Sequence, residues 1–210
     1  MTKKYNSVLI IGMGLIGSSI SRALVENHVA NSVYGLDSDD NIIKKCHDLN
    51  LLVQGETNLN NFDLQFDLII ICTPLSAYKN IFSSLSDFIS QPTLITDVGS
   101  TKMSTISDFK NAVTNNNITF VPSHPIAGLE KSGPEYGFSK LFDNRYCILT
   151  PYETNDDATS SISEMWRSIG MTVELMEADR HDRVLAMTSH IPQLIAFSVV
   201  GTATELESHM

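Results

Sequence analysis

The sequence predicts an α/β fold in which a mostly parallel, doubly wound sheet carries helices on both faces. Short apolar runs typical of buried strands alternate with longer stretches of helical spacing through the first half of the chain. The run at residues 67–72 is apolar at nearly every position, as a parallel strand covered on both faces should be. A glycine-rich turn joins the first strand to the first helix, an arrangement typical of βαβ units.

The expected elements follow one another along the chain. Strands are predicted at residues 8–11, 32–36, 51–53, 67–72, 93–97, 118–121, 145–150 and 172–176, and helices at 15–25, 41–49, 78–89, 100–113 and 157–169. Asp39 or Asp40 is the expected N-cap of the second helix, and Ser100 or Thr101 that of the fourth. Gly170 is placed to end the fifth helix.

The turn after the first strand has the pattern G-x-G-x-x-G and comprises Gly12, Met13, Gly14, Leu15, Ile16 and Gly17. The first glycine permits a tight turn, the second lets the backbone approach a pyrophosphate, and the third lets helix and strand pack closely. The N-terminus of the helix also presents unpaired N–H groups to phosphates. We therefore interpret the first half as a Rossmann-like dinucleotide-binding domain; the alternative is a glycine-rich turn that binds nothing.

An acidic residue and a Thr-Pro dipeptide complete the expected cofactor site. Asp37 ends the second strand, about where the fold places a ribose-binding carboxylate. Its charge would repel a 2′-phosphate, and the first basic residue after it is Lys44, so NAD is favoured over NADP. Thr73 and Pro74 follow another strand and should lie at the same carboxyl edge of the sheet.

The composition excludes several classes of function. Among 210 residues, 42% are hydrophobic and 18% charged, and the formal net charge is −10, which argues against binding nucleic acid or an anionic membrane. No apolar run reaches the length of a transmembrane span, and no signal peptide is apparent. Cys46, Cys72 and Cys147 are too widely spaced for a disulfide framework or a metal knuckle. We expect reduced thiols, no bound metal and a cytoplasmic location.

His124 is the candidate for acid–base catalysis. It leaves a strand at the cofactor edge, where an imidazole can take a proton from a substrate hydroxyl while hydride leaves the adjacent carbon. The alternative is a structural histidine that fixes the following loop. Ser100 can hydrogen-bond this imidazole or the substrate, or act only as a helix cap. Lys102 is expected to be a solvated helix charge.

The second half departs from the βα rhythm. Residues 122–141 are rich in proline and glycine, and loops of this length are usually functional or disordered. Residues 180–208 have helical spacing, interrupted by Pro192, which should kink or divide the helix. A lone amphipathic helix cannot bury its apolar stripe, so this one should dock on a partner chain or belong to a larger helical domain. His190 and Gln193 share a face of it, whereas His181 lies half a turn out of phase with His190.

Four separated motifs resemble those of the prephenate and arogenate dehydrogenases of tyrosine biosynthesis. They are GMGLIGSS at 12–19, DVGSTK at 97–102, SHPIAGLEKSG at 123–133, and HD at 181–182 with SHIP at 189–192. The resemblance implies an NAD(P)-dependent oxidative decarboxylation of a cyclohexadienol. It implies that His124 is the catalytic histidine, that Ser100 supports it and the nicotinamide, and that Glu130 lies at the mouth of the active site.

The resemblance also implies substrate contacts from the last helix. His190 matches the first histidine of the family's S-H-x-P-H segment, and Gln193 stands in place of the second. Family members continue into a helical dimerisation domain that supplies an arginine for the substrate carboxylate. We therefore expect residues 1–176 to be the dinucleotide-binding domain and 177–210 the start of a helical dimerisation and substrate domain, with a homodimer as the assembly.

The expected function is that of an NAD-dependent prephenate dehydrogenase, which produces 4-hydroxyphenylpyruvate. One alternative is arogenate dehydrogenase, which produces tyrosine directly; another is a β-hydroxyacid or imine oxidoreductase. The latter usually places a lysine base on its interdomain helix, and no lysine follows Lys140 here. A non-enzymatic alternative is a dinucleotide-sensing module, which would need the cofactor half but not His124 or Ser100.

Overall fold

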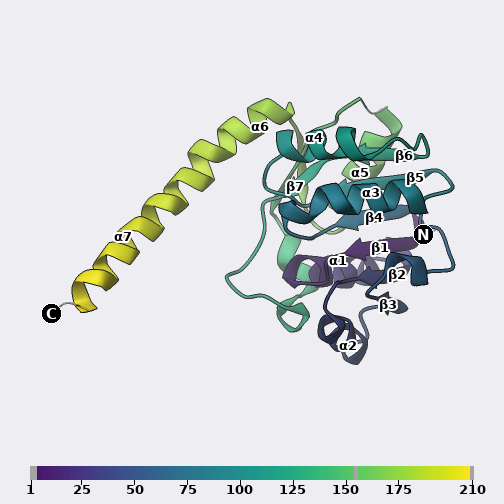
Figure 1. Ribbon diagram of the computed structural model, residues 1–210, viewed down its shortest axis with the longest axis horizontal. Helices are drawn as coiled ribbons and strands as arrows, with labels where there is room; N and C mark the ends of the chain where they lie inside the picture. The colour runs from purple at the N-terminus through teal and green to yellow at the C-terminus, as the bar shows by residue number, and fades with distance from the viewer. Residues whose placement is uncertain (1–3, 154–155, 209–210) are drawn as a thin grey trace.

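A six-stranded parallel sheet forms the centre of the computed structural model, which describes residues 4–153 and 156–208 (Figure 1). Its strands are β1 (Tyr5–Ile11), β2 (Ala30–Leu36), β3 (Gln54–Glu56), β4 (Leu68–Ile71), β5 (Thr93–Asp97) and β6 (Ile118–Val121). They are arranged in the order β3-β2-β1-β4-β5-β6, and every neighbouring pair is parallel. The strand order reverses between β1 and β4, so the predicted doubly wound fold is confirmed and ligands are expected at that point.

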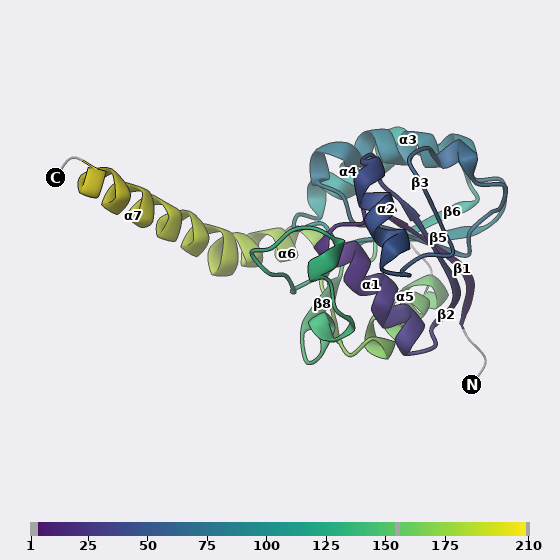
Figure 2. The same cartoon turned by 90° about the horizontal axis from the view of Figure 1, so that it is seen from below.

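Helices cover both faces of this sheet, as Figures 1 and 2 show. They are α1 (Leu15–Glu26), α2 (Asp40–Asp48), α3 (Tyr78–Phe88), α4 (Met103–Ala112) and α5 (Asp156–Ser168). Successive residues of a strand point to opposite faces, so the central strands contribute to two cores. One core contains Ile10, Ile70, Leu24 of α1 and Trp166 of α5, and the other contains Ile11, Ile71, and Phe82 and Leu85 of α3.

A smaller sheet continues from the end of β6. It comprises β7 (Ser123–Pro125), β8 (Tyr146–Leu149) and β9 (Thr172–Leu175), with β7 antiparallel and β9 parallel to β8. The sequence analysis assigned residues 123–125 to the long loop, which is wrong. The residue pair His124↔Ile148 now fixes the backbone of the candidate catalytic histidine in a sheet.

The helix boundaries test the predicted caps. The carboxylate of Asp39 accepts the N–H of Asn41 at 2.9 Å, so one of the two proposed caps of α2 is confirmed. The prediction for the fourth helix is wrong, because α4 begins at Met103 and its N-cap is Lys102. The carboxylate that accepts its first N–H groups comes from a residue 80 positions away, as described below.

The long loop is bound to the first helix over part of its length. It forms two 3₁₀ turns, η3 (Pro134–Tyr136) and η4 (Ser139–Phe142). The Phe138 N–H donates to Ser19 Oγ at 3.1 Å, and the Arg22 guanidinium donates to the Pro134 carbonyl at 3.2 Å. This half of the loop therefore rests on the helix whose N-terminus follows the glycine turn.

The C-terminal helical segment projects away from the sheets (Figures 1 and 2). It consists of α6 (Ala178–Leu185), a π-helical turn η5 (Ala186–His190) and α7 (Ile191–Ser208). The π-helical turn ends two residues before Pro192, which lacks an N–H to donate, so the α-helical hydrogen-bond pattern changes near the predicted position while the helix itself continues.

Helix α7 exposes many apolar side chains, including Leu194, Phe197 and Val200. The helix at Ala178–Thr202 is long enough to cross a membrane, and an 18-residue window within it is apolar enough, with a mean hydropathy of 1.5. Composition alone therefore does not exclude a span here, contrary to the sequence analysis. An apolar helix that packs on other helices has the same composition.

The cysteines have no disulfide partner in the described structure, and Cys46 and Cys147 are buried. Burial raises the pKa of the Cys46 thiol to about 11, and that of Cys72 still further. Both thiols therefore stay protonated near neutral pH and are poor nucleophiles.

Candidate active site

The glycine turn has the geometry that its sequence requires. Gly12 has φ +94°, and a Cβ there would lie 2.8 Å from the carbonyl carbon and oxygen of Cys72. A Cβ on Gly17 would overlap the carbonyl oxygen of Gly12, which is where α1 packs on the turn. At Gly14, in contrast, no described residue outside the turn and its own helix has an atom within 4 Å of the Cβ position, so the backbone there is open to a ligand.

The carboxylate of Asp37 connects the turn to the end of β2. It accepts the Met13 N–H at 2.8 Å and the Asp39 N–H at 3.0 Å. The side chains of Met13 and Leu15 are buried, and Ile16 packs against the core, so these residues offer only backbone groups to a ligand.

A pocket of about 420 Å³ opens beside this turn. Gly12, Gly14, Asp37, Thr73 and Pro74 are among the residues that line it. The Thr73 Oγ1 atom is buried and has no hydrogen-bond partner among the described residues. A buried hydroxyl without a partner is rare, and a ligand in this pocket would supply one. The residues present therefore fit a dinucleotide whose pyrophosphate lies on the N-terminus of α1.

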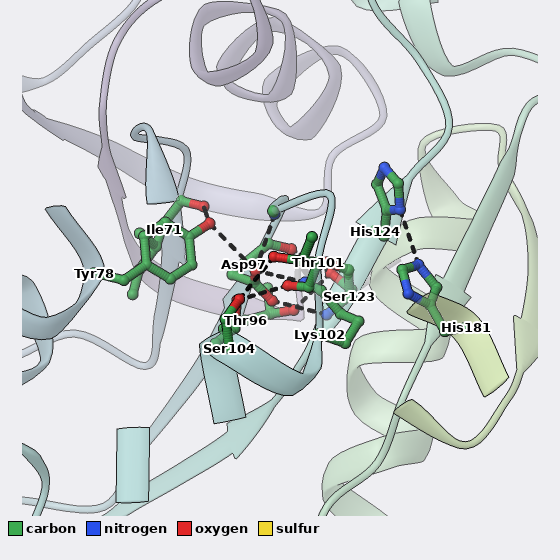
Figure 3. Close-up of polar contacts among 12 residues, drawn as sticks. Ile71, Tyr78, Thr96, Asp97, Thr101, Lys102, Ser104, Ser123, His124 and His181 are labelled. Atoms are coloured by element: carbon green, nitrogen blue, oxygen red, sulfur yellow. Dashed lines mark hydrogen bonds and ion pairs between the residues drawn. The ribbon is translucent and has the colours of Figure 1, made fainter. Parts of the chain in front are cut away.

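His124 meets a second histidine that the sequence analysis did not include in the site. The His124 Nδ1 atom lies 2.9 Å from Nε2 of His181, which is buried at the start of α6 (Figure 3). The Nδ1 atom of His181 lies 2.8 Å from Oδ1 of Asp182. Two segments 57 positions apart in the chain thus meet at one imidazole pair.

Asp182 connects this pair to α4. Its two oxygens accept the backbone N–H groups of Lys102 at 2.7 Å and Met103 at 2.9 Å. Burial alone would raise the pKa of the Asp182 carboxyl, but these N–H groups and His181 hold it below its usual value. The carboxylate is therefore ionised at neutral pH and serves as the missing cap of α4.

These contacts define the tautomers of both histidines. Burial lowers the pKa of His181, so it is neutral near pH 7, and the hydrogen bond to Asp182 opposes this effect only in part. Its one proton lies on Nδ1, because the carboxylate can only accept. Its Nε2 must then accept from His124 Nδ1, so in the uncharged form of His124 the lone pair lies on Nε2.

A buried ion pair between Lys102 and Asp97 contacts the backbone next to His124. The Lys102 ammonium and Asp97 Oδ2 are 2.6 Å apart, and both side chains are fully buried. The expectation that Lys102 is a solvated charge is therefore wrong. Its ammonium also donates to the Ser123 carbonyl at 2.6 Å, and Asp97 Oδ1 accepts the Ser123 N–H at 2.9 Å. Both groups hold the residue next to His124, as Figure 3 shows.

Ser100 lies in the turn between β5 and α4 and is half-buried. Its hydroxyl makes no hydrogen bond to the residues that the structure describes, so it neither caps α4 nor hydrogen-bonds the His124 imidazole. His181 instead supplies a hydrogen bond to the imidazole, which was one of the roles considered for Ser100. The role of Ser100 toward a substrate stays a prediction.

The structure brings Glu130 and Gln193 to one place. With Gly128, Leu129 and Phe197 they line a hollow of about 710 Å³ between the loop and α7. The side chain of His190 lies outside the described part of the structure, so its predicted substrate contact stays a prediction. In residues 4–153 and 156–208, no group of three His, Cys, Asp or Glu is arranged to hold a metal.

The buried His181 predicts a pH-dependent stability. The folded-state pKa of His181 lies below the unfolded value of about 6.5. Near and below that pH, this imidazole therefore binds a proton more readily in the unfolded chain than in the folded chain. The free energy of unfolding should therefore fall on acidification from about pH 7.5 to 5.5. Urea unfolding at both values should show a smaller fall in His181→Asn than in the unsubstituted protein. Equal falls in the two proteins would contradict this assignment.

The strand order, the glycine turn and the pocket beside it define a dinucleotide-binding α/β domain with a histidine pair at its edge. A sequence model of the nucleotide-binding domain of prephenate dehydrogenase matches residues 20–175. The cyclohexadienyl dehydrogenase of Zymomonas mobilis is 34% identical over 204 residues, covering 97% of this chain and 69% of that protein. The chain belongs to the prephenate dehydrogenase family.

Two further relatives show how much of the family this chain spans. The prephenate dehydrogenase of Bacillus subtilis is 30% identical, with 95% of this chain and 54% of that protein aligned. A crystal structure of prephenate dehydrogenase from A. aeolicus in complex with hydroxyphenyl propionate and NAD⁺ superposes with a TM-score of 0.88 at 33% identity. The alignment covers 94% of this chain and 68% of the A. aeolicus chain. The chain thus spans between about half and about two thirds of these relatives.

Proposed function

We propose that the protein is an NAD-dependent dehydrogenase that oxidatively decarboxylates prephenate to 4-hydroxyphenylpyruvate, with arogenate as the alternative substrate. The observation that carries this proposal is the His124–His181–Asp182 chain at the carboxyl edge of the sheet. It presents the His124 imidazole beside the strand edge at which the glycine turn lies. Family membership and the ligands of the A. aeolicus relative support the same reaction.

The protein's own residues would hold the cofactor and move one proton. Backbone N–H groups of the turn Gly12, Met13, Gly14, Leu15, Ile16 and Gly17 would bind the pyrophosphate, while Asp37 binds the ribose and Thr73 and Pro74 line the crevice. When bound, NAD supplies the acceptor for the hydride that leaves the ring carbon. Asp37 favours NAD over NADP because its charge would repel a 2′-phosphate.

His124 would act as the general base. Its Nε2 lone pair accepts the proton of the ring hydroxyl as hydride leaves the same carbon. The ring carboxylate then departs as carbon dioxide, the electrons of its bond to the ring complete the aromatic system, and the phenolate oxygen takes the proton back from His124. The imidazolium formed on His124 gains stabilisation from His181 and, through it, from the ionised Asp182. Ser100, Glu130, His190 and Gln193 are the proposed substrate contacts.

Residues 177–210 would begin a helical domain that pairs two subunits. The exposed apolar side chains of α7, such as Leu194 and Phe197, need a helical partner to leave water. A homodimer in the cytoplasm, with the small-molecule substrate bound near this helix, is the arrangement that we propose. It requires neither nucleic acid nor a membrane.

Absorbance of the reduced cofactor tests the proposed activity. Addition of NAD and prephenate, and in a second assay NAD and arogenate, should produce NADH at a rate proportional to protein. Absence of NADH with both substrates would overturn the proposal, while cofactor binding without turnover would support the dinucleotide-sensing alternative.

A further inference from the structure

The cofactor pocket beside the glycine turn continues into a second pocket of about 420 Å³, here called the outer pocket. The two pockets are contiguous, because both are lined by Ile11, Leu36, Thr57 and Ile81. The outer pocket lies between the turn after β3 and helix α3, and its polar lining includes Asn58, Asn60, Asn80, Ser84 and Asp87. None of these polar residues has a part in the proposed reaction.

Helix α3 runs along both pockets. Ala77, just before the helix, and Ile81 line the cofactor pocket, whereas Ser84 and Asp87 line the outer pocket. Residues three and four apart share a face of a helix, so Asn80, Ser84 and Asp87 form one polar stripe along the outer pocket. A rise of about 1.5 Å per residue places Asp87 about 9 Å further along the helix axis than Ile81. The outer pocket therefore begins where the cofactor pocket ends.

The wall of the outer pocket that faces α3 is fixed by hydrogen bonds. The Glu56 carbonyl accepts the Asp37 N–H at 3.1 Å, which connects this wall to the proposed ribose site. The Glu56 carboxylate accepts the side-chain amide of Asn61 at 3.0 Å. Between these residues, the Asn60 N–H donates to Asn58 Oδ1 at 3.0 Å. The pocket is therefore built from a fixed turn on one side and a regular helix on the other.

The outer pocket combines an apolar floor with one charged group. Ile11, Leu59 and Leu85, which line it, are buried side chains of the core. Asp87 is exposed, and it is the only charged residue among the described residues that line the pocket. An alkyl chain that ends in an ammonium group matches this arrangement, because the chain can cover apolar surface while its charged end stays near the carboxylate and water.

The base of a bound dinucleotide would face the outer pocket. With the pyrophosphate on Gly14 and the ribose on Asp37, the adenine continues away from the glycine turn along the crevice. Thr57 and Ile81, which the two pockets share, lie in that direction. The exocyclic amino group of adenine is on the edge of the ring opposite the bond to ribose. A substituent on that amino group would therefore leave the cofactor pocket toward the outer pocket.

We propose that the outer pocket is a subsite for a cationic substituent on the adenine, so that the protein binds NAD derivatives enlarged at the exocyclic amino group. The inference rests on the proposed binding of NAD and adds a subsite that neither the hydride transfer nor the substrate uses. An alkyl arm on the adenine lies over the apolar floor, and an ammonium group at its end reaches Asp87.

Calorimetric titration of the protein tests this subsite without turnover. The ligands are NAD and three NAD derivatives that carry a hexyl, an aminohexyl or a carboxypentyl arm on the exocyclic amino group. The hexyl derivative should bind within a few-fold of NAD, because the pocket has room for the arm. The aminohexyl derivative should bind about fivefold more tightly than the carboxypentyl derivative, the size of effect expected from one exposed charge.

Two substitutions place the arm in the outer pocket. Asp87→Asn should abolish the preference for the aminohexyl over the carboxypentyl arm. Asp63→Asn is the matched control, because it removes the same charge from an exposed position that does not line the pocket, and it should keep the preference. Ser84→Phe should fill the pocket and weaken binding of the hexyl derivative more than binding of NAD.

Three results would overturn the inference. They are binding of the hexyl derivative more than about tenfold weaker than that of NAD, equal binding of the two charged derivatives, and an equal effect of Ser84→Phe on NAD and on the hexyl derivative. In each of these cases the measured binding of NAD leaves the proposed cofactor site standing. That site fails instead if neither NAD nor any derivative binds.

Discussion

Replacement of His124 with Asn should lower kcat by about 10²–10⁴-fold while NAD binding stays close to that of the unsubstituted protein. An Asn side chain can still donate a hydrogen bond toward His181, but it has no group that accepts a proton near neutral pH. The backbone at this position is held by β8, so the substitution should not disturb the strand. Stopped assays with prephenate and arogenate measure kcat, and fluorescence titration measures NAD affinity.

The same variant separates catalysis from structure. Loss of turnover together with loss of NAD binding would indicate that His124 stabilises the loop and is not the proton acceptor. Turnover within a few-fold of the unsubstituted protein would show that the base is another residue. His181→Asn provides the comparison, because it removes the partner of His124 without removing the proposed base, and should lower kcat less than His124→Asn does.

The sheet was predictable because its signals are local. Each buried parallel strand is a short apolar run, and the residues at 93–97 and 118–121 become β5 and β6 with the predicted boundaries. The third strand is displaced, because the run at residues 51–53 precedes β3 at Gln54–Glu56. Strand β7 was missed because a run of three residues that follows Pro122 and ends at Pro125 carries no periodicity. Its existence depends on pairing with β8, more than 20 residues later.

The candidate site was predictable only at the level of single residues. His124 was found from its position after a strand, but its partner His181 was discounted because helical phase was compared only with His190 on the same helix. The HD pair at 181–182 was a usable signal, since adjacent His and Asp side chains can form a hydrogen-bonded unit. Lys102 was misjudged because a lysine in a helix start is usually exposed. Only tertiary structure places it between Asp97 and the Ser123 carbonyl.

Replacement of Lys102 with Met should lower the free energy of unfolding by about 3–5 kcal/mol, because it leaves the Asp97 carboxylate buried without its cation. Hydrogen bonds from the Ser123 and Gly99 N–H groups would remain, but they do not neutralise the charge. Urea unfolding followed by circular dichroism measures the change. Lys79→Met on the exposed face of α3 is the control for loss of a lysine and should change stability little.

A double variant, Asp97→Asn with Lys102→Met, removes both charges and should recover much of the lost stability. In the double variant the Ser123 carbonyl would still lack its hydrogen bond from the Lys102 ammonium, which is 2.6 Å long in the unsubstituted protein. This loss could reach catalysis because His124 is the next residue in the strand. If Lys102 positions the catalytic strand as well as neutralising Asp97, Lys102→Met should also lower kcat. In that case kcat should stay low in the double variant although its stability returns. If kcat recovers with stability, the ion pair is a structural element alone. If stability does not recover, Asp97 is held by its hydrogen bonds rather than by Lys102.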